Sequence, residues 1–363
     1  MKIGLFLGAG ASVPYNKPTT VELKNRLLEK YQNRGLFQAL LEHPEFQDIE
    51  YVLTAVRQIV KFSKTLGGSF CKTNTGNFSS HADTLQEFEK VLENEIFENY
   101  SWKHSDDETV SKIITPIFDI IKKESNEITV FTTNYDRSIE EYCSNPDNRL
   151  RCVDGFHLNQ YNGRFLWAKG DYGYLGKNDE GHDVFLYKIH GSLNWKKHTK
   201  YGIERTTYER KPAEDSNYDE DFLIYPTLSP KDEAEGKEPY NTILDKFDET
   251  LKALDACIVI GFSFRDGHIN EKFAEFVNAG KKLILLGPNA ASDFRINVLK
   301  HEPTDEEQQK WKQSELQGLH RIKEDKDSVK WDIHFIQKKL EIETISKVVH
   351  DIQRAIKPEK HPF

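Results

Sequence analysis

The chain has 363 residues, of which 37% are hydrophobic and 30% charged, and its formal net charge is −9. This composition is typical of a globular protein with a large core and a well-solvated surface. The acidic balance argues against broad sequence-independent nucleic-acid binding, which needs a basic surface. No apolar run approaches the roughly 20 residues of a membrane span.

Cysteine usage and the amino terminus indicate a reducing, cytoplasmic setting. The four cysteines (Cys71, Cys143, Cys152 and Cys257) are scattered and form no C-x-x-C pair. Neither a zinc ribbon nor a disulfide framework is therefore predicted. The opening Met-Lys-Ile-Gly leads directly into the first predicted strand, so we expect no signal peptide.

The apolar run at residues 3–7 predicts a buried strand, and it continues into Gly-Ala-Gly-Ala-Ser at 8–12. Glycines let the backbone turn tightly and bring N–H groups close to a phosphate or a sugar. Thr19 and Glu22 then predict a capped helix start. A strand, a small-residue turn and a helix are typical of a nucleotide-binding opening. Val13 replaces the next fingerprint glycine, so a tight turn without a ligand is the alternative.

Residues 31–122 change character, because apolar residues recur there at helical spacing. They predict several helices inserted into an α/β core, with a polar loop at 71–81. Packing accounts for nearly all of this segment, and we expect no direct chemistry from it.

Strands and helices alternate again from residue 128. Apolar runs predict strands at 128–133, 184–189, 222–225, 256–260, 282–286 and 332–337, and helices at 137–142, 241–255, 269–279 and 342–356. Residues 196–221 are polar and predict a surface excursion. Residues 301–330 are highly charged and predict an exposed helix and loop.

This alternation predicts an α/β fold, a doubly wound Rossmann-like parallel sheet with a helical insertion domain. The expected core comprises 1–30 and 123–300, and the insertion comprises 31–122. Residues 301–363 would supply the charged segment, the last strand and a closing helix.

Small or polar residues follow five of the predicted strands. They are Gly8 to Ser12, Thr132 to Asp136, His190 to Ser192, Gly261 to Ser263 and Gly287 to Asn289. In a parallel sheet these ends lie along one edge, where ligands bind in open α/β folds. Their convergence predicts one ligand cleft.

Four of these segments resemble the sirtuin-like superfamily in order and spacing. GAGAS resembles the family's glycine–alanine–glycine loop, and TTNYD at 132–136 resembles its T-Q-N-I-D segment. KIHGSLNW at 188–195 resembles its K-x-H-G-S segment, which carries the active-site histidine, and GFSF at 261–264 resembles its G-T-S-L segment. The resemblance covers 1–20 and 128–295, and it implies a fold that binds NAD.

Departures from the family's protein deacylases point to one branch. Residues 196–221 contain no cysteine, whereas the deacylases carry a four-cysteine zinc module there. Thr133 replaces a glutamine, and VPYNKPT replaces the segment P-D-F-R. The chain is similar instead to bacterial sirtuin-like proteins of antiphage defence, which hydrolyse NAD to nicotinamide and ADP-ribose. YPTLSPK at 225–231 is similar to a segment of that branch. The resemblance implies NAD as substrate and no zinc.

Cleavage of the nicotinamide–ribose bond passes through an oxocarbenium-like state, so it needs a base and polar groups beside the ribose. The resemblance implies two catalytic residues: His190 as general base and Asn134 as the residue that holds the water and a ribose hydroxyl. The resemblance also implies substrate-binding residues. The pyrophosphate and nearby sugar would contact Gly8, Ala9, Gly10, Ala11 and Ser12. Asp136 would bind the carboxamide, with Thr132 in the same segment, and the adenosine half would contact Gly261, Ser263 and Asn289. No metal ligand is predicted.

Structural alternatives stand beside these roles. His190 could be a core histidine, and Asn134 and Asp136 could be turn residues or helix caps. Ser263 could only cap the following helix. Arg265 and Asp266 predict a surface ion pair, Lys231 is either a phosphate ligand or a solvated lysine, and Cys257 is a core residue.

Two further functions remain open, an NAD-dependent protein deacylase and a non-enzymatic sensor of NAD or ADP-ribose that controls a partner. An ungated NADase would poison its own cell, so we expect a homo-oligomer or an activating partner. The resemblance implies a hexameric DNA-translocase-type ATPase encoded beside it, with nucleic acid involved only indirectly and no membrane. Residues 31–122 and 301–363 are the expected assembly surfaces.

Overall fold

The computed structural model describes residues 1–357 apart from 33, 47, 75–77, 169–171, 173–180, 208, 210–217, 224–237, 301–318, 323–324, 327–328 and 331. The segment 225–231, with Lys231, therefore lies outside the described residues, as does the first part of the charged segment. No helix in the described part of the chain is long and apolar enough to cross a membrane.

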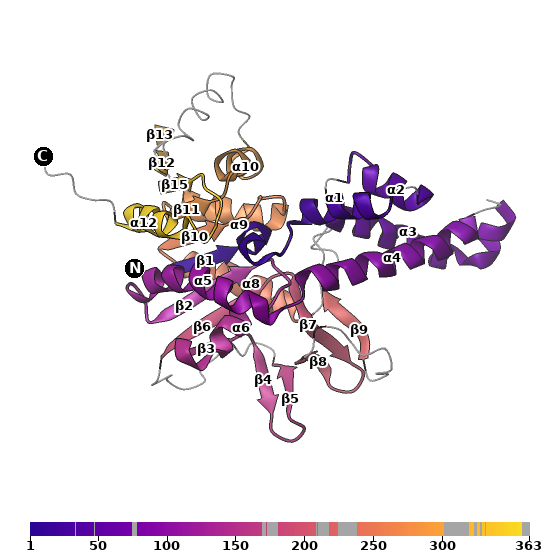
Figure 1. The fold of residues 1–363 in the computed structure, drawn as a ribbon, viewed down its shortest axis with the longest axis horizontal. Helices are drawn as coiled ribbons and strands as arrows, with labels where there is room; N and C mark the ends of the chain where they lie inside the picture. The colour runs from indigo at the N-terminus through magenta and orange to yellow at the C-terminus, as the bar shows by residue number, and fades with distance from the viewer. Residues whose placement is uncertain are drawn as a thin grey trace, which may run out of the picture.

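An eight-stranded sheet forms the centre of the molecule, in the order β12-β15-β11-β10-β1-β2-β6-β3 (Figure 1). Its strands are β1 (Ile3–Leu7), β2 (Glu127–Thr132), β3 (Leu150–Val153), β6 (His182–Lys188), β10 (Ala256–Ile260), β11 (Lys282–Leu286), β12 (Leu319–Ile322) and β15 (Asp332–Ile336). All neighbours pair in parallel except β12 with β15. The structure thus confirms the predicted doubly wound α/β fold.

Both faces of the sheet are covered, which is why its strands are nearly continuous apolar runs. Leu5 packs on one face in a core that includes residues of α5 (Asp107–Lys122), α6 (Ser138–Ser144) and α12 (Ile345–Ile356). Phe6 packs on the other face, in a core that includes residues of α8 (Tyr240–Ala253), α9 (Gly267–Asn278) and α10 (Ala290–Asn297). The two cores fix the sheet edge from which the polar loops emerge.

A second sheet was not predicted. It is antiparallel, in the order β4-β5-β8-β7-β9, and consists of β4 (Phe156–Asn159), β5 (Arg164–Trp167), β7 (Gly191–His198), β8 (Gly202–Arg205) and β9 (Tyr218–Leu223). The surface excursion predicted at 196–221 is therefore wrong where the end of β7, all of β8 and the start of β9 lie. Lys196 and His198 are buried in β7, and a strand that buries polar residues lacks the apolar pattern on which prediction depends. The short strands β13 (Asp325–Lys326) and β14 (Val329–Lys330) pair as a separate two-stranded sheet.

The predicted insertion at 31–122 contains α2 (Gly35–Glu42), α3 (Ile49–Asn74) and α4 (Phe78–Tyr100), which share a core with α1 (Thr20–Lys30), whereas α5 packs on the sheet. The four helices α1 to α4 are called the insertion from here on. Thr19 and Glu22 form the predicted capping box of α1. Helices α3 and α4 pair as a long hairpin that projects from the sheet (Figure 1). The predicted loop at 71–81 is wrong over most of its length, because polar residues continue a helix once packing has established it. The core of the insertion also includes Tyr135 and Leu193, which lie beside the sheet edge.

Glycines let the ends of β1 and β10 touch. A Cβ on Gly8 would lie 2.6 Å from the carbonyl oxygen of Gly261, and a Cβ on Gly10 would lie 2.8 Å from the Cα of Gly261. Gly261 itself has φ of +64°, in the left-handed region that favours glycine. The two loops therefore pack backbone against backbone, and side chains there would separate them.

We expect Gly261→Ala to lower the free energy of unfolding by about 2–5 kcal/mol, because the added Cβ meets the first loop as well as an unfavourable φ. Gly280→Ala is the matched control, since Gly280 has φ of +73° and no atom within 4 Å of an added Cβ. It should cost only about 1–2 kcal/mol. Urea unfolding of the two variants measures the difference, and equal losses would contradict the packing argument.

Candidate functional site

A cavity lies where the strand order reverses. From β1 the chain builds β2, β3 and β6 on one side, and it then returns to build β10, β11 and β15 on the other. Ligands of open α/β sheets bind at such a reversal. The cavity measures about 190 Å³, more than ten times the volume of about 10–15 Å³ that one water needs. The loops after β1, β2, β6 and β10 all line it, through Ala9, Ser12, Thr133, Asn134, Tyr135, Asp136, His190, Gly261, Phe262, Ser263, Arg265, Asp266 and Gly267.

The backbone of the first loop is held by the neighbouring loop. The N–H of Gly8 donates to the carbonyl of Ile260 at 2.9 Å, and the N–H of Gly10 donates to the carbonyl of Gly261 at 2.9 Å. Residues Ala9–Ala11 then form a 3₁₀ turn, η1. These two glycine N–H groups are thus already paired, and the glycines first serve to join two strand ends.

A hydrogen-bond network connects the first loop to TTNYD. The side-chain amide of Asn134 donates to the Gly8 carbonyl at 3.0 Å and to Ser12 Oγ at 2.9 Å. Ser12 Oγ in turn donates to Asp136 Oδ2 at 2.7 Å, and Asp136 Oδ1 accepts the N–H of Ser138 at 3.0 Å. Both amide hydrogens of Asn134 are used in this way. Its Oδ1 is therefore the atom that can accept a hydrogen bond from a ligand or a water.

Thr132, at the end of β2, holds the backbone of Asn134 in place. Its hydroxyl donates to the carbonyl of Leu7 at 3.0 Å and accepts the N–H of Asn134 at 3.0 Å. It is buried at the end of β2 and is not among the residues that line the cavity. Thr132 thus sets the position of Asn134 rather than offering itself to a ligand.

His190 and Asp266 form a buried pair. His190 follows β6, Asp266 follows β10, and Nε2 of the imidazole lies 3.2 Å from Oδ2 of the carboxylate. Their side chains are each only 6% exposed. Asp266 also caps α9, because its Oδ1 accepts the N–H groups of His268 and Ile269. Burial acts to raise the pKa of Asp266, but His190 and the two N–H donors outweigh it and hold the pKa below its ordinary value.

Arg265 and Asp266 do not pair with each other, so the predicted surface ion pair is wrong. Arg265 Nη1 lies 2.9 Å from Asp48 Oδ2, which belongs to the insertion, whereas Asp266 faces His190. Two adjacent residues in an extended loop point to different partners, and sequence adjacency cannot distinguish this from an ion pair.

Some of the other predicted site residues line the cavity, and others do not. Ala9, Gly261 and Ser263 line the cavity together with Asn134 and His190. Gly8, Gly10 and Ala11 lie in the first loop but are not among its lining residues, and Asn289 is exposed at the start of α10. Cys257 is a core residue of β10, as predicted. In the described part of the chain, no group of three or more His, Cys, Asp or Glu could hold a metal ion.

Residues of the insertion also line the cavity, and sequence reasoning missed them. They are Thr20, Asp48, Glu50, Tyr51 and Tyr100. The only local signal was that Asp48 precedes a helix, which predicts a cap and nothing more. Their position depends on how the insertion packs against Tyr135 and Leu193, and no motif records that contact.

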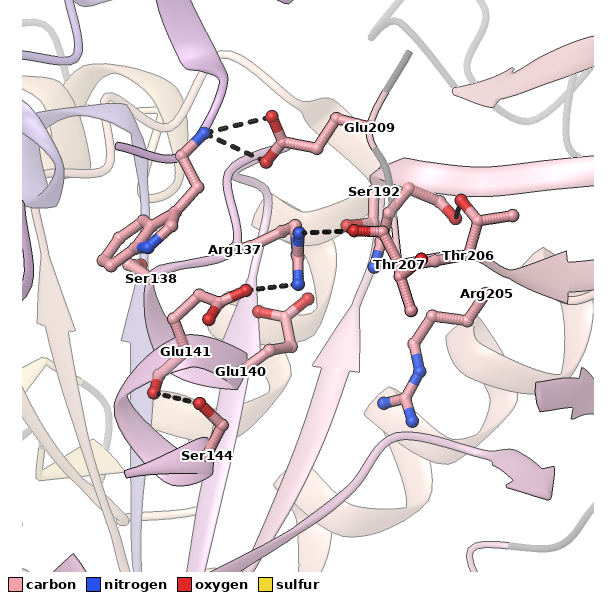
Figure 2. Close-up of polar contacts among 12 residues, drawn as sticks. Arg137, Ser138, Glu140, Glu141, Ser144, Ser192, Arg205, Thr206, Thr207 and Glu209 are labelled. Carbon is pink, nitrogen blue, oxygen red and sulfur yellow. Dashed lines mark hydrogen bonds and ion pairs between the residues drawn. The ribbon is translucent and has the colours of Figure 1, made fainter. Parts of the chain in front are cut away.

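Arg137, the residue after TTNYD, contacts α6 and the segment after β8 (Figure 2). Arg137 pairs with Glu141 of α6 and also donates to the carbonyl of Thr207 at 3.5 Å. The carboxylate of Glu209 accepts the backbone N–H of Trp102 at 3.0 and 3.1 Å. The segment after β8 thus contacts Arg137, just before α6, and Trp102, just after α4.

Comparison with known proteins identifies a family match. A model of the SIR2-like domain matches residues 128–317, just over half of the 363 residues. Among solved structures, a mutant Sir2 homologue in complex with 2′-O-acetyl ADP-ribose is 12% identical with a TM-score of 0.42, over 99% of this chain and 94% of that chain. A Sir2 homolog–NAD complex is 12% identical with a TM-score of 0.41, over 98% and 90% of the two chains. No curated protein matches the sequence.

Asp266→Asn tests the buried pair, because asparagine retains the helix cap and removes the charge. A carboxylate with a depressed folded-state pKa contributes stability that is present above its unfolded pKa of about 3.9 and is lost as the pH falls through the folded value. We expect the variant to be less stable than the wild type near neutral pH. The difference should narrow as the pH falls below about 4. Urea unfolding across this pH range checks it, and a constant difference would contradict the assigned pair.

Proposed function

The chain belongs to the family of SIR2-like domains, and from this premise we propose that it hydrolyses the nicotinamide–ribose bond of NAD, releasing nicotinamide and ADP-ribose. The observation that carries the proposal is the shared cavity, which joins the His190–Asp266 pair to Asn134. These groups come from three strand ends and meet at the switch point where dinucleotides bind in this class of sheet.

His190 acts as the general base. Asp266 accepts a hydrogen bond from Nε2–H and so orients the ring, which leaves Nδ1 with the lone pair for proton transfer. The base takes a proton from a ribose hydroxyl or from the attacking water as the nicotinamide leaves.

Asn134 positions the water. Its amide hydrogens are bound to Gly8 and Ser12, so Oδ1 accepts a hydrogen bond from the water or from a ribose hydroxyl. Both carboxylate oxygens of Asp136 already accept hydrogen bonds from the protein. Each oxygen has a further lone pair, with which it can accept from the carboxamide of nicotinamide.

The charges around the cavity favour the reaction. Asp136 and Asp266 both line it, and their carboxylates are held by hydrogen bonds donated by the protein. The nicotinamide–ribose bond breaks through a state with positive charge on the ribose. Negative charge that the protein holds in place beside the ribose stabilises such a state.

We propose a role in bacterial antiphage defence, where depletion of NAD stops an infected cytoplasm from supporting the phage. The support is the lack of cysteine in residues 196–221, the replacement of P-D-F-R by VPYNKPT, and the similarity of YPTLSPK at 225–231 to a segment of that branch. Activity would be gated by homo-oligomerisation or by a hexameric DNA-translocase-type ATPase encoded beside this protein, through residues 31–122 or 301–363.

We expect the purified protein, alone or with the neighbouring ATPase, to release nicotinamide and ADP-ribose from NAD. His190→Ala and Asn134→Ala should each lower the rate by about 100-fold or more. His104→Ala is the matched control, because the His104 side chain is 99% exposed and should retain the wild-type rate. Chromatography of the products measures each rate and separates ADP-ribose from a cyclised product.

Other outcomes would favour the alternatives. If neither the protein alone nor the mixture releases nicotinamide, the hydrolase function is wrong. Deacylation of an acyl-lysine peptide that depends on His190 would favour a deacylase. Full protection against phage by the His190→Ala protein would favour a non-enzymatic sensor.

A further inference from the structure

The first turn of α3 is fixed at the cavity. Asp48 caps it, because Oδ1 accepts the backbone N–H groups of Glu50 at 3.0 Å and Tyr51 at 3.2 Å. The other oxygen of Asp48 pairs with Arg265, in the loop after β10. Helix α3 therefore begins against the loop after β10, and its first turn has a defined position there.

Glu50 reaches from this turn to the TTNYD loop. Its Oε1 accepts the hydroxyl of Tyr135 at 2.8 Å, and Tyr135 stands between Asn134 and Asp136 in the sequence. Glu50 and Tyr135 both line the cavity. One oxygen of the Glu50 carboxyl is thus bound by the protein, and Oε2 is the atom left to interact with a ligand.

The surroundings of Glu50 favour its protonated form. Burial, followed by the charge of Asp48, raises the pKa of Glu50 well above its ordinary value, and the Tyr135 hydrogen bond and Arg265 only partly offset this. The titratable and charged side chains that line the cavity with it are Asp48, Tyr51, Tyr100, Tyr135, Asp136, His190, Arg265 and Asp266. A protonated carboxyl can donate a hydrogen bond, which a carboxylate cannot.

A second group beside Glu50 lacks a partner. Tyr100, the last residue of α4, is 6% exposed and lines the cavity. Its hydroxyl has no hydrogen-bond partner among the residues described. Burial raises the pKa of Tyr100 well above its ordinary value, so the hydroxyl keeps its proton. A buried hydroxyl without a partner is costly, and a polar ligand in the cavity would satisfy it.

We propose that Glu50 is a substrate-binding residue contributed by the insertion, whose carboxyl, oriented by Tyr135, donates a hydrogen bond to an oxygen acceptor on the nicotinamide–ribose half of NAD. The acceptor is the carboxamide oxygen or a ribose hydroxyl. The carboxylate of Asp266 contributes to the raised pKa of Glu50, and it also pairs with His190, the base that we assign to the ribose. The inference rests on the proposed function in naming NAD.

The test compares Glu50→Ala with Glu50→Gln, which keeps a neutral donor. Glu50→Ala should raise the KM for NAD between about twofold and tenfold, as expected for one lost hydrogen bond, and Glu50→Gln should raise it less. The wild-type KM should rise as the pH passes the raised pKa of Glu50, since ionisation removes the donor. Glu50→Gln should lack this rise. Glu45→Ala, an exposed glutamate in the same segment, is the matched control.

Binding measurements separate this inference from the proposed function. In the His190→Ala background, NAD affinity measured by calorimetry should fall for Glu50→Ala by the same factor. If the wild type releases no nicotinamide but this loss of affinity is seen, the hydrolase function is wrong and the Glu50 role stands. If the wild type is active but Glu50→Ala matches Glu45→Ala in KM and affinity, the Glu50 role is wrong.

A structural role for Glu50 gives a different pattern. Loss of the Tyr135 hydrogen bond alone would lower thermal stability and leave the pH dependence of KM in Glu50→Gln equal to that of the wild type. That result overturns the proposal. Tyr135→Phe is a second variant, since it keeps the ring that packs in the insertion core and removes the hydroxyl that orients Glu50. It should raise KM and keep the pH dependence.

Discussion

The backbone contact between the loops after β1 and β10 is the constraint on which the site depends. Gly8 and Gly10 donate hydrogen bonds into the end of β10 and the following Gly261, at distances that leave no room for a Cβ. This contact lies beside the cavity, at the point where the strand order reverses. It also sets how far Ser12 stands from Asn134 on one side and how Asp266 approaches His190 on the other.

Two buried carboxylates, those of Asp136 and Asp266, line the cavity. Asp136 is held by Ser12 and by the N–H of Ser138, and Asp266 is held by His190 and by the start of α9. Hydrogen bonds donated by the protein hold both carboxylates in fixed positions, so they are preorganised for a ligand. A ribose that gains positive charge as its bond to nicotinamide breaks suits these two carboxylates.

The insertion contributes side chains to the cavity. Its helices α3 and α4 bring Glu50 and Tyr100 to the cavity, and its core is continuous with Tyr135. Through Glu209, the segment after the second sheet's β8 contacts the chain leaving α4. A partner that bound the projecting hairpin would therefore act on residues in direct contact with the cavity, which gives the proposed gating a physical route.

The amino-acid sequence by itself determined the parallel sheet and the polar residues at its edge. Strands such as β1 and β10 are buried on both faces, so their composition alone marks them, and His190 and Asn134 follow at the strand ends. Only the tertiary structure decided that Asp266 faces His190 and that Arg265 faces Asp48. The second sheet and the role of the insertion were also decided there, because β7 buries polar side chains and Glu50 reaches the cavity only through packing between segments distant in the chain.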